Sequence, residues 1–216
     1  AVEYQGAVLT YDELNRKANQ LAHFLRNKGI GPDSLVGISL ERSLDVIVGI
    51  YGILKAGGAY VPLDPSYPEQ RLRYMIDAAQ LKVLLTQEKF TENFKDNEKL
   101  EVIALDAEWA MISGELEENP KPLATLENLI YVIFTSGSTG QPKGAAVYHK
   151  GFVNLLEWFV TEFSITAKDR TLLFSSLSFD LTQKNLYATL IRGGSLHLYP
   201  QTPYEVPLLS RLIQDN

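Results

Sequence analysis

Apolar and polar positions change their spacing repeatedly along the chain, which predicts alternating helices and strands. Thr10 and Glu13 have the spacing of a capping box, and a helical pattern runs from there to Gly29, with Pro32 just beyond. One face of this predicted helix is apolar and consists of Leu14, Ala18, Leu21, Ala22 and Leu25. We therefore expect an amphipathic helix that packs on a core.

Further helices and strands follow in alternation. Ser43 can cap a second, very apolar helix that runs through Ala56 and stops at Gly57. Two more helices are predicted over residues 68–79 and 152–163. Short continuous apolar runs predict strands covered on both faces, at 35–40, 59–63, 82–85, 102–105, 129–134, 172–174 and 196–199. This order predicts an α/β fold, with a mostly parallel sheet layered with helices.

Several segments are predicted not to be sites or membrane spans. Residues 91–99 and the acidic residues 113–122 are polar and are expected to be solvated loops. The most apolar stretch, 46–63, is interrupted by charge, glycine and proline, so we expect a buried helix and strand rather than a transmembrane span. Residues 1–4 carry no secretion signal and no initiator Met. A cytoplasmic protein, or a piece cut from one, with no membrane partner is expected.

The composition limits the chemistry and the partners. The chain has 216 residues, with 20 Lys and Arg against 26 Asp and Glu, a formal net charge of −6 and a pI of about 5.2. This balance argues against a protein that binds nucleic acid through bulk electrostatics. The sequence contains no cysteine, which excludes disulfides, thiolate catalysis and zinc held by cysteine.

A loop of glycines and hydroxyl residues follows the apolar run at 129–134. Its glycines allow close approach of backbone N–H groups to an anion, its hydroxyls add donors, and Lys143 adds a positive charge. It is not a Walker A loop, because Gln141 and Pro142 separate Gly140 from Lys143. The candidate phosphate-binding residues are Thr135, Ser136, Gly137, Ser138, Thr139, Gly140, Lys143 and Gly144.

The histidines are predicted to be structural. His149 follows the loop at a helix start, His23 lies on the first helix, and His197 lies in a predicted strand. The run GGSLH at 193–197 has His where a nucleophile elbow needs its second glycine, so a hydrolase is not predicted.

Four motifs carry a family resemblance. The run FTSGSTGQPKG at 134–144 resembles the phosphate loop of the adenylate-forming superfamily, which includes acyl-CoA ligases, luciferases and the adenylation domains of nonribosomal peptide synthetases. LTYDELN at 9–15, LKAGGAYVPLDPSYP at 54–68 and LSFDLTQKN at 177–185 resemble the first, second and fourth core motifs of the peptide-synthetase branch, in the right order. The resemblance spans nearly the whole chain and implies the large subdomain of the adenylate-forming fold.

The resemblance implies an ATP-dependent ligase of natural-product biosynthesis that activates an α-amino acid. The amino-acid carboxylate attacks the α-phosphorus of Mg-ATP, pyrophosphate leaves, and the aminoacyl group passes to the phosphopantetheine thiol of a carrier protein. The loop would hold the β- and γ-phosphates, where charge accumulates on the leaving pyrophosphate. ATP and Mg²⁺ are the implied cofactors, and the carrier protein and neighbouring synthetase domains are the implied partners. No catalytic residue or metal ligand is assigned within residues 1–216.

The resemblance also assigns a substrate site. Phe179, Asp180, Leu181 and Lys184 match positions that bind the amino acid, and the Asp180 carboxylate would pair with its α-ammonium. Asp180 could instead cap the helix beginning near Leu181, or do both. Lys184 could pair with Asp180 four residues earlier, or point into the pocket and favour a polar or anionic substrate side chain.

Motifs that lie further along in the family are missing. Residues 1–216 contain no counterpart of the Tyr-Gly-Pro-Thr-Glu and Thr-Gly-Asp motifs, of the hinge, or of the small C-terminal subdomain with its lysine. We therefore expect the N-terminal portion of an adenylation domain, which needs the missing C-terminal part of the same domain and is inactive or nearly so alone. The alternatives are a non-catalytic half-domain with a docking or scaffold role, and a fragment of an acyl-CoA or aryl-acid ligase, which Asp180 opposes.

Overall fold

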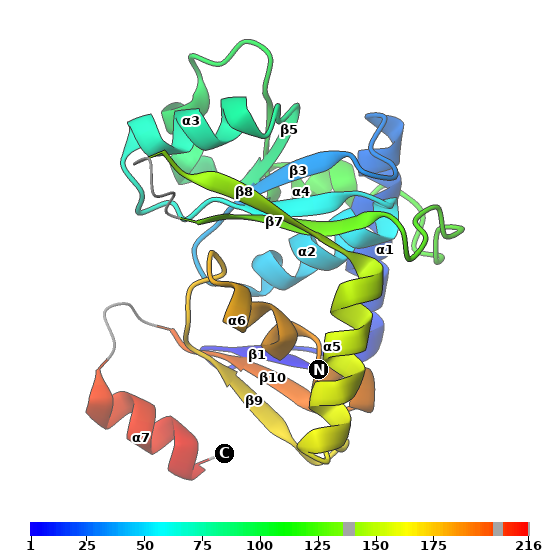
Figure 1. Cartoon of the computed structure of the whole chain (residues 1–216), viewed down its shortest axis with the longest axis vertical. Helices are drawn as coiled ribbons and strands as arrows, with labels where there is room; N and C mark the ends of the chain where they lie inside the picture. The colour runs from blue at the N-terminus through cyan, green and yellow to red at the C-terminus, as the bar shows by residue number, and fades with distance from the viewer. Residues whose placement is uncertain (136–140, 201–204, 216) are drawn as a thin grey trace.

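The strands form two sheets, with helices between and around them (Figure 1). The computed structural model describes residues 1–135, 141–200 and 205–215. The larger sheet has six strands in the order β6-β5-β3-β4-β7-β8. Its members are β3 (Leu35–Ser39), β4 (Ala59–Pro62), β5 (Val83–Thr86), β6 (Glu101–Ala104), β7 (Leu129–Thr135) and β8 (Lys143–Tyr148). All neighbouring pairs are parallel except β7 with β8, so the predicted α/β class with a mostly parallel sheet is confirmed.

The smaller sheet combines two strands from residues 2–9 with two strands from residues 170–198. It has four strands in the order β2-β1-β10-β9. They are β1 (Val2–Tyr4), β2 (Ala7–Leu9), β9 (Arg170–Leu173) and β10 (Ser195–Leu198). β10 runs parallel to both β1 and β9, and only β2 is antiparallel. β9 and β10 were predicted from the sequence, whereas β1, β2 and β8 were not: β1 and β2 have only three residues each, and the residues of β8 are mostly exposed.

The helices α1 (Tyr11–Asn27) and α2 (Leu44–Ala56) pack on each other, and the residues at their ends explain where each helix begins or stops. α1 begins with the predicted capping box, in which Thr10 and Glu13 bond each other's backbone N–H. α2 ends at Gly57, whose φ of 101° is left-handed, as predicted. Ser43 is the N-cap residue of α2, but its side chain makes no cap hydrogen bond, so that part of the prediction is wrong. α1 and α2 pack closely, because a Cβ on Gly52 would lie 2.6 Å from Leu21 Cδ2.

The remaining helices cover the strands and carry the connections. They are α3 (Glu69–Ala78), α4 (Leu105–Ile112), α5 (His149–Glu162), the short α6 (Asp180–Gln183) and α7 (Val206–Asp215), with 3₁₀ turns η1 (Glu88–Phe94), η2 (Lys184–Leu186) and η3 (Leu190–Arg192). Two details differ from prediction. Leu105 begins α4 rather than ending a strand, and η1 occupies part of the segment expected to be loop, where Phe94 is buried. None of the helices in the described residues is both long and apolar enough to cross a membrane.

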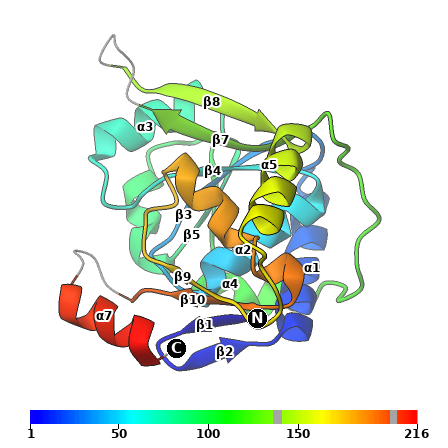
Figure 2. The same ribbon diagram turned by 60° about the horizontal axis from the view of Figure 1, so that its bottom comes forward.

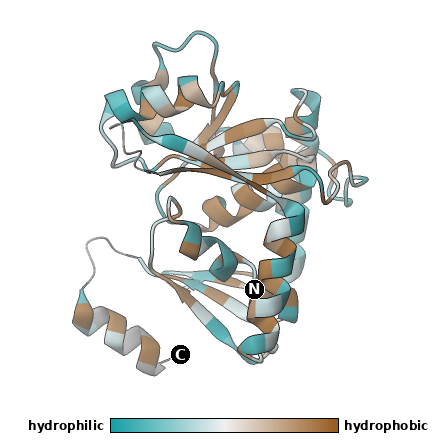
Figure 3. Cartoon of the chain, in the orientation of Figure 1, coloured by the Kyte–Doolittle hydropathy of each residue, from teal (hydrophilic) through white to brown (hydrophobic). Residues whose placement is uncertain are grey.

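The larger sheet is covered on both faces. Its side chains alternate between two hydrophobic clusters, as Tyr131 and Val132 on β7 illustrate. The first cluster contains α1, α2 and α5, and the second contains α3. Figure 3 shows the hydrophobic colour along β3 and on α2. This two-sided burial is the physical reason that continuous apolar runs predicted these strands.

The acidic connector at 113–122 is exposed over most of its length but is tied to α1. Asn19 Nδ2 donates to Glu117 O at 2.5 Å and Gln20 Nε2 donates to Ser113 O at 2.7 Å, and both donor residues are buried. Arg26 also donates to Lys121 O at 2.8 Å. The prediction of a surface segment therefore holds, while the backbone carbonyls of this segment are held by polar side chains of a helix.

Candidate functional site

β7 and β8 form an antiparallel hairpin around the candidate phosphate loop (Figure 1). Thr135 pairs with Lys143 and Phe134 with Gly144, and Thr135 Oγ1 donates to Lys143 O at 3.5 Å. Thr135, Lys143 and Gly144 are exposed, whereas residues 130–134 are buried. The strand is thus anchored in both hydrophobic clusters and presents its end to solvent. Ser136, Gly137, Ser138, Thr139 and Gly140 lie outside the described residues.

The described ends of this loop have donors suited to an anion. Thr135 offers a hydroxyl and Lys143 an exposed ammonium, to which the structure gives no ion pair within residues 1–135, 141–200 and 205–215. Gly144 packs tightly on the neighbouring strand, since a Cβ there would lie 3.1 Å from Val132 Cγ1. Hydroxyls, a glycine and a lysine at the end of a buried strand fit a polyphosphate. In the described part of the chain no three His, Asp or Glu side chains are grouped to hold a metal ion.

The candidate substrate residues lie on and beside α6, which sits between the two sheets next to α5 (Figures 1 and 2). Phe179 and Leu181 are 63% and 73% exposed, and Asp180 is also exposed. Asp180 Oδ1 accepts a hydrogen bond from the adjacent Leu181 N at 2.7 Å, but the N-cap of α6 is Phe179 and no side chain caps it, so the expected capping role of Asp180 is wrong. Among the described residues Asp180 Oδ2 has no partner. This second carboxylate oxygen can therefore accept a hydrogen bond from a ligand.

The Lys184 ammonium contacts groups other than the Asp180 carboxylate. Its Nζ donates to Leu181 O at 2.9 Å and lies 5.1 Å from the centroid of the Phe159 ring on α5. In the part of the chain that the structure describes, no ion pair joins Lys184 to Asp180. Of the two alternatives for Lys184, the structure thus disfavours the intrahelical pair.

The segment before α6 is held by groups from the larger sheet. Arg42, in the turn before α2, donates to Phe174 O and also to Tyr199 O at 3.2 Å. Ser176 Oγ donates to Asp64 Oδ2 at 3.0 Å, and Asp64 lies just after β4. These contacts join residues that follow β9 in the smaller sheet to loops of the larger one. The candidate substrate segment is therefore positioned by both sheets.

Tyr131 links the two candidate half-sites. It lies on β7, four residues before Thr135, and is buried against Tyr60 and Phe152 at ring-centroid distances of 5.6 Å. Burial raises the pKa of Tyr131, and the negative charge of Asp180 raises it further. Gln183 on α6 bonds to Tyr60, whose ring packs on Tyr131, so the helix that carries Asp180 lies against the strand of the phosphate loop. The sequence analysis did not single out Tyr131, because an apolar strand gives no signal for which of its residues will face a distant helix.

Two further residues that sequence reasoning missed lie behind α6. Thr182 and Gln183 are fully buried, and Gln183 Oε1 accepts a hydrogen bond from Tyr60 Oη at 2.5 Å. A glutamine next to exposed substrate residues resembles any polar helix position in the sequence. The LSFDLTQKN run gives no signal for their burial, because Thr182 and Gln183 are polar and directly follow exposed residues.

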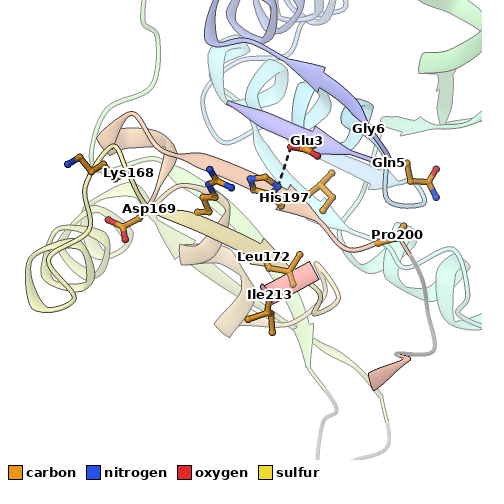
Figure 4. A pocket seen from close by; sticks show the side chains of 11 residues that line it. Glu3, Gln5, Gly6, Lys168, Asp169, Leu172, His197, Pro200 and Ile213 are labelled. Atoms are coloured by element: carbon orange, nitrogen blue, oxygen red, sulfur yellow. Dashed lines mark ion pairs between the residues drawn. The ribbon is translucent and has the colours of Figure 1, made fainter. Parts of the chain in front are cut away.

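A cavity of about 420 Å³ lies on the outer face of the smaller sheet, apart from these residues (Figure 4). On this face Ser195 Oγ is 2.9 Å from His197 Nε2, and His197 Nδ1 is 3.4 Å from Glu3 Oε2. Burial lowers the pKa of His197, and Glu3 opposes this shift. The set resembles a hydrolytic triad, but Ser195 N donates to Asp169 O and Leu196 N to Ala1 O. Because these amides are used within the sheet, they offer no oxyanion hole, and we assign the set to joining β1 and β10.

His149 occupies the start of α5, as predicted. Its backbone N–H donates to Asn128 O at 2.9 Å, and burial lowers the pKa of its imidazole, with Asp33 opposing the shift. Asp33 accepts from Leu129 N at 2.8 Å and from Asn128 Nδ2 at 2.9 Å. His149 thus belongs to the polar cluster that starts β7 and α5, which fits a structural role.

Comparison with known proteins decides the family. The whole chain, residues 1–216, matches the family described as AMP-binding enzyme. The chain belongs to the AMP-binding enzyme family. It is 46% identical to a linear gramicidin synthase of Brevibacillus parabrevis over 201 residues, which are 93% of this chain and 4% of that protein. It is 43% identical to zwittermicin A synthase ZmaJ of Bacillus cereus over 197 residues, 91% of this chain and 37% of that protein.

Two solved structures have a similar fold. The nonribosomal peptide synthetase FmoA3, with alpha-methyl-L-serine-AMP bound, superposes with a TM-score of 0.91 at 31% identity, over 100% of this chain and 24% of that one. The N-terminal subdomain of Klebsiella oxytoca NpsA superposes with a TM-score of 0.83 at 23% identity, over 99% of this chain and 52% of that one, which shows the fold. The chain is thus part of an adenylate-forming adenylation domain of the nonribosomal peptide synthetase type, and it spans only a small part of the length of most of these relatives.

Proposed function

We propose that residues 1–216 are the N-terminal portion of an adenylation domain that converts an α-amino acid and ATP into aminoacyl-AMP and pyrophosphate. An oxygen of the amino-acid carboxylate forms a bond to the α-phosphorus, the bond from that phosphorus to the β-phosphate oxygen breaks, and pyrophosphate leaves with the electron pair. The family membership supports the use of ATP, and the AMPPNP-bound structure of FmoA3 agrees with it. No proton has to be removed from an ionised carboxylate, so positioning and charge supply the catalysis.

The phosphate loop is the first half of the proposed site. Thr135, Lys143 and Gly144, together with residues 136–140, would hold the β- and γ-phosphates. The exposed hydroxyl and ammonium at the hairpin ends support this assignment, because they can stabilise charge on the leaving group as it develops. Mg²⁺ would neutralise phosphate charge when bound; the phosphates themselves and one or two carboxylates commonly suffice to hold it.

The observation that carries the choice of substrate is the exposed Asp180 carboxylate beside the strand of the phosphate loop. A carboxylate in that place repels the carboxylate and phosphates of the reactants unless a positive charge accompanies them. The α-ammonium of an amino acid supplies such a charge and forms a charge-assisted hydrogen bond. An acid without an amine would leave Asp180 unpaired on binding, which disfavours an acyl-CoA or aryl-acid ligase. Phe179, Leu181 and Lys184 would contact the rest of the substrate.

The complete domain and its partners are also part of the proposal. The names of the relatives are those of peptide and zwittermicin synthases, in which this chain matches a small part. We infer that the remainder of the domain completes the nucleotide site, so that residues 1–216 alone do not activate an amino acid. The aminoacyl group would then pass to the phosphopantetheine thiol of a carrier protein in a neighbouring synthetase domain.

Amino-acid-dependent exchange of pyrophosphate into ATP tests this function. It should be measured for each amino acid on the 216-residue chain and on the longer protein that contains it. We expect exchange with one or a few amino acids in the longer protein only. Exchange with aryl or fatty acids alone would contradict the substrate class, and no exchange with any acid would favour a docking or scaffold role.

Asp180→Asn in the longer protein tests the assigned carboxylate. The variant keeps the size of the side chain but removes the charge, so kcat/KM for the amino acid should fall by about a hundredfold, as for a charged hydrogen bond lost in a desolvated site. The KM for ATP should change by no more than about twofold. Glu162→Gln, at the end of α5, is a matched control that also removes one negative charge. An unchanged kcat/KM in Asp180→Asn would refute the pairing with the ammonium.

A further inference from the structure

Three buried side chains form a directed chain of hydrogen bonds that ends beside Asp180. Tyr187 Oη donates to Tyr60 Oη at 3.1 Å, and Tyr60 Oη donates to Gln183 Oε1 at 2.5 Å. Gln183 Nε2 then donates to Leu177 O at 2.7 Å and to Phe179 O at 3.2 Å. Each group donates onward in one direction, so the bonds reinforce one another. The chain ends on the backbone of the residue that precedes Asp180.

The orientation of the glutamine amide is dictated by its partners. Two backbone carbonyls face one side of the Gln183 amide and require the NH₂ group there, so Oε1 must face Tyr60. Burial raises the pKa of Tyr60 and of Tyr187, and both hydroxyls therefore keep the protons that they donate. The only partner that the described residues give to Gln183 Oε1 is the Tyr60 hydroxyl.

This chain of hydrogen bonds joins two parts of the molecule. Tyr60 lies on β4, in the centre of the larger sheet, while Gln183 lies on α6, in the connection between β9 and β10 of the smaller sheet. Asp180 and Leu181 are exposed, while Thr182 and Gln183 are fully buried. Thr182 Oγ1 also donates to a backbone carbonyl of this segment, that of Ser176, at 2.8 Å. The buried residues of α6 thus bind the loop whose exposed residues form the proposed substrate site.

We propose that Tyr60 and Gln183 are positioning residues that set the place of the Asp180 carboxylate, and so the affinity for the amino-acid substrate. The inference rests on the proposed role of Asp180 and extends it to a residue in the other sheet. Apolar packing could have filled the same space without a buried amide. A buried amide and a buried hydroxyl are unfavourable unless they are hydrogen-bonded. Here the Tyr60 hydroxyl bonds the Gln183 amide, and that amide bonds the backbone carbonyls of Leu177 and Phe179. The network therefore fixes the position of the backbone at residues 177–179, which apolar packing alone would not do.

Tyr60→Phe in the longer protein tests the proposal, with Tyr51→Phe as the matched control. Tyr51 packs on Tyr187 with a ring-centroid distance of 5.6 Å, and the structure gives its hydroxyl no hydrogen bond among the described residues. Tyr60→Phe leaves Gln183 Oε1 buried without a donor, and the loss of one such bond corresponds to about a tenfold effect. We expect the KM for the amino acid to rise about tenfold and the KM for ATP to stay within about twofold. Tyr51→Phe should leave both within about twofold.

A substrate analogue separates positioning from general damage. The carboxylic acid that lacks the α-amine cannot use Asp180, so its inhibition constant should be the same within about twofold in wild type and in Tyr60→Phe. Tyr187→Phe removes only the outer bond and should raise the KM for the amino acid about twofold to threefold. Equal effects of Tyr60→Phe and Tyr51→Phe, or a parallel rise of the KM for the amino acid and for ATP, would overturn the proposal.

Hydrogen exchange gives a readout that needs no activity. In Tyr60→Phe the amides of residues 177–181 should exchange about tenfold faster than in Tyr51→Phe, while those of β4 and β7 keep the same rates. Equal exchange of residues 177–181 in the two variants would also overturn the proposal. If the wild-type enzyme activates no amino acid, the proposed function fails, and this measurement still decides whether Tyr60 positions the loop that carries Asp180.

Discussion

The two sheets differ in how many of their faces are buried. The strands of the larger sheet send alternate side chains into two hydrophobic clusters, as Leu84 and Leu85 do on β5. The smaller sheet buries Val2 and Leu196 on one face and carries Glu3 and His197 on the other, where the open cavity lies. Burial on two faces constrains every position of a strand, whereas burial on one face constrains every second position. The pattern of apolar residues therefore predicts the strands of the larger sheet more completely than those of the smaller sheet.

The proposed site lies where these two kinds of structure meet. The larger sheet contributes the rigid strands β4 and β7, and the loop that follows β9 brings Asp180 to them. Besides the hydrophobic cluster that they share, the two parts make specific polar contacts, such as those of Arg42 and Asp64 with the segment before α6. A two-sided core supplies rigidity, while a loop held by hydrogen bonds supplies a substrate site that can vary.

Leu84→Ala should have the largest effect on stability. Leu84 is fully buried on β5, and its Cδ1 would lie 2.7 Å from a Cβ on Gly37, so its neighbours cannot close the space that it leaves. We expect a loss of about 2–5 kcal/mol in the free energy of unfolding. Leu172→Ala on β9 is the matched control, because Leu172 lines the open cavity, and it should lose no more than about 1 kcal/mol. Urea denaturation of both variants measures the difference, and equal losses would contradict the contrast between the sheets.

Tyr11→Phe should have an intermediate effect. The Tyr11 hydroxyl donates to Leu190 O at 2.9 Å and to Gly194 O at 2.7 Å, which ties α1 to the turn before β10. Its loss should lower the free energy of unfolding by about 0.5–1.5 kcal/mol. Tyr74→Phe on α3 is a suitable control, since the structure gives the Tyr74 hydroxyl no hydrogen bond within the described residues. If both variants unfold at the same urea concentration as the wild type, polar links do not hold the smaller sheet.

Protonation of His197 should have the smallest effect. Burial lowers the pKa of His197 in the folded chain, so the unfolded chain binds the proton more readily. The contribution of the neutral imidazole to stability is therefore present above the unfolded pKa of about 6.5 and is lost as the pH falls below it. His149 shifts in the same direction. NMR titration should show both imidazoles titrating below the ordinary range, and His197→Gln should flatten part of the decline in stability between pH 7 and pH 5.

A titration of His197 at or above the ordinary histidine pKa would contradict this prediction. It would mean that Glu3 and solvent outweigh burial on the open face of the smaller sheet. The same result for His149 would contradict the downward shift that burial gives to the pKa of its imidazole.

Much of the fold and part of the site could be predicted from the sequence. The capping box at Thr10, the left-handed Gly57 and the apolar runs of the larger sheet act through neighbouring residues or through burial on both faces, and these predictions are confirmed. β1 and β2 were missed because strands of three residues are too short to show a period. Of the candidate phosphate residues, Thr135, Lys143 and Gly144 lie where the motif predicts, at the mouth of the hairpin.

The sequence by itself determined the local elements, the loop chemistry at 135–144 and the family to which those motifs point. Only the tertiary structure decided that Tyr60 would meet Gln183, that Tyr131 would pack on Tyr60, and that Lys184 would turn toward α5. Tyr60 and Gln183 are separated by 123 positions, and no pattern within either segment specifies the other. Local preferences arise from a residue and its neighbours in the chain, whereas these contacts depend on which faces of two sheets come together.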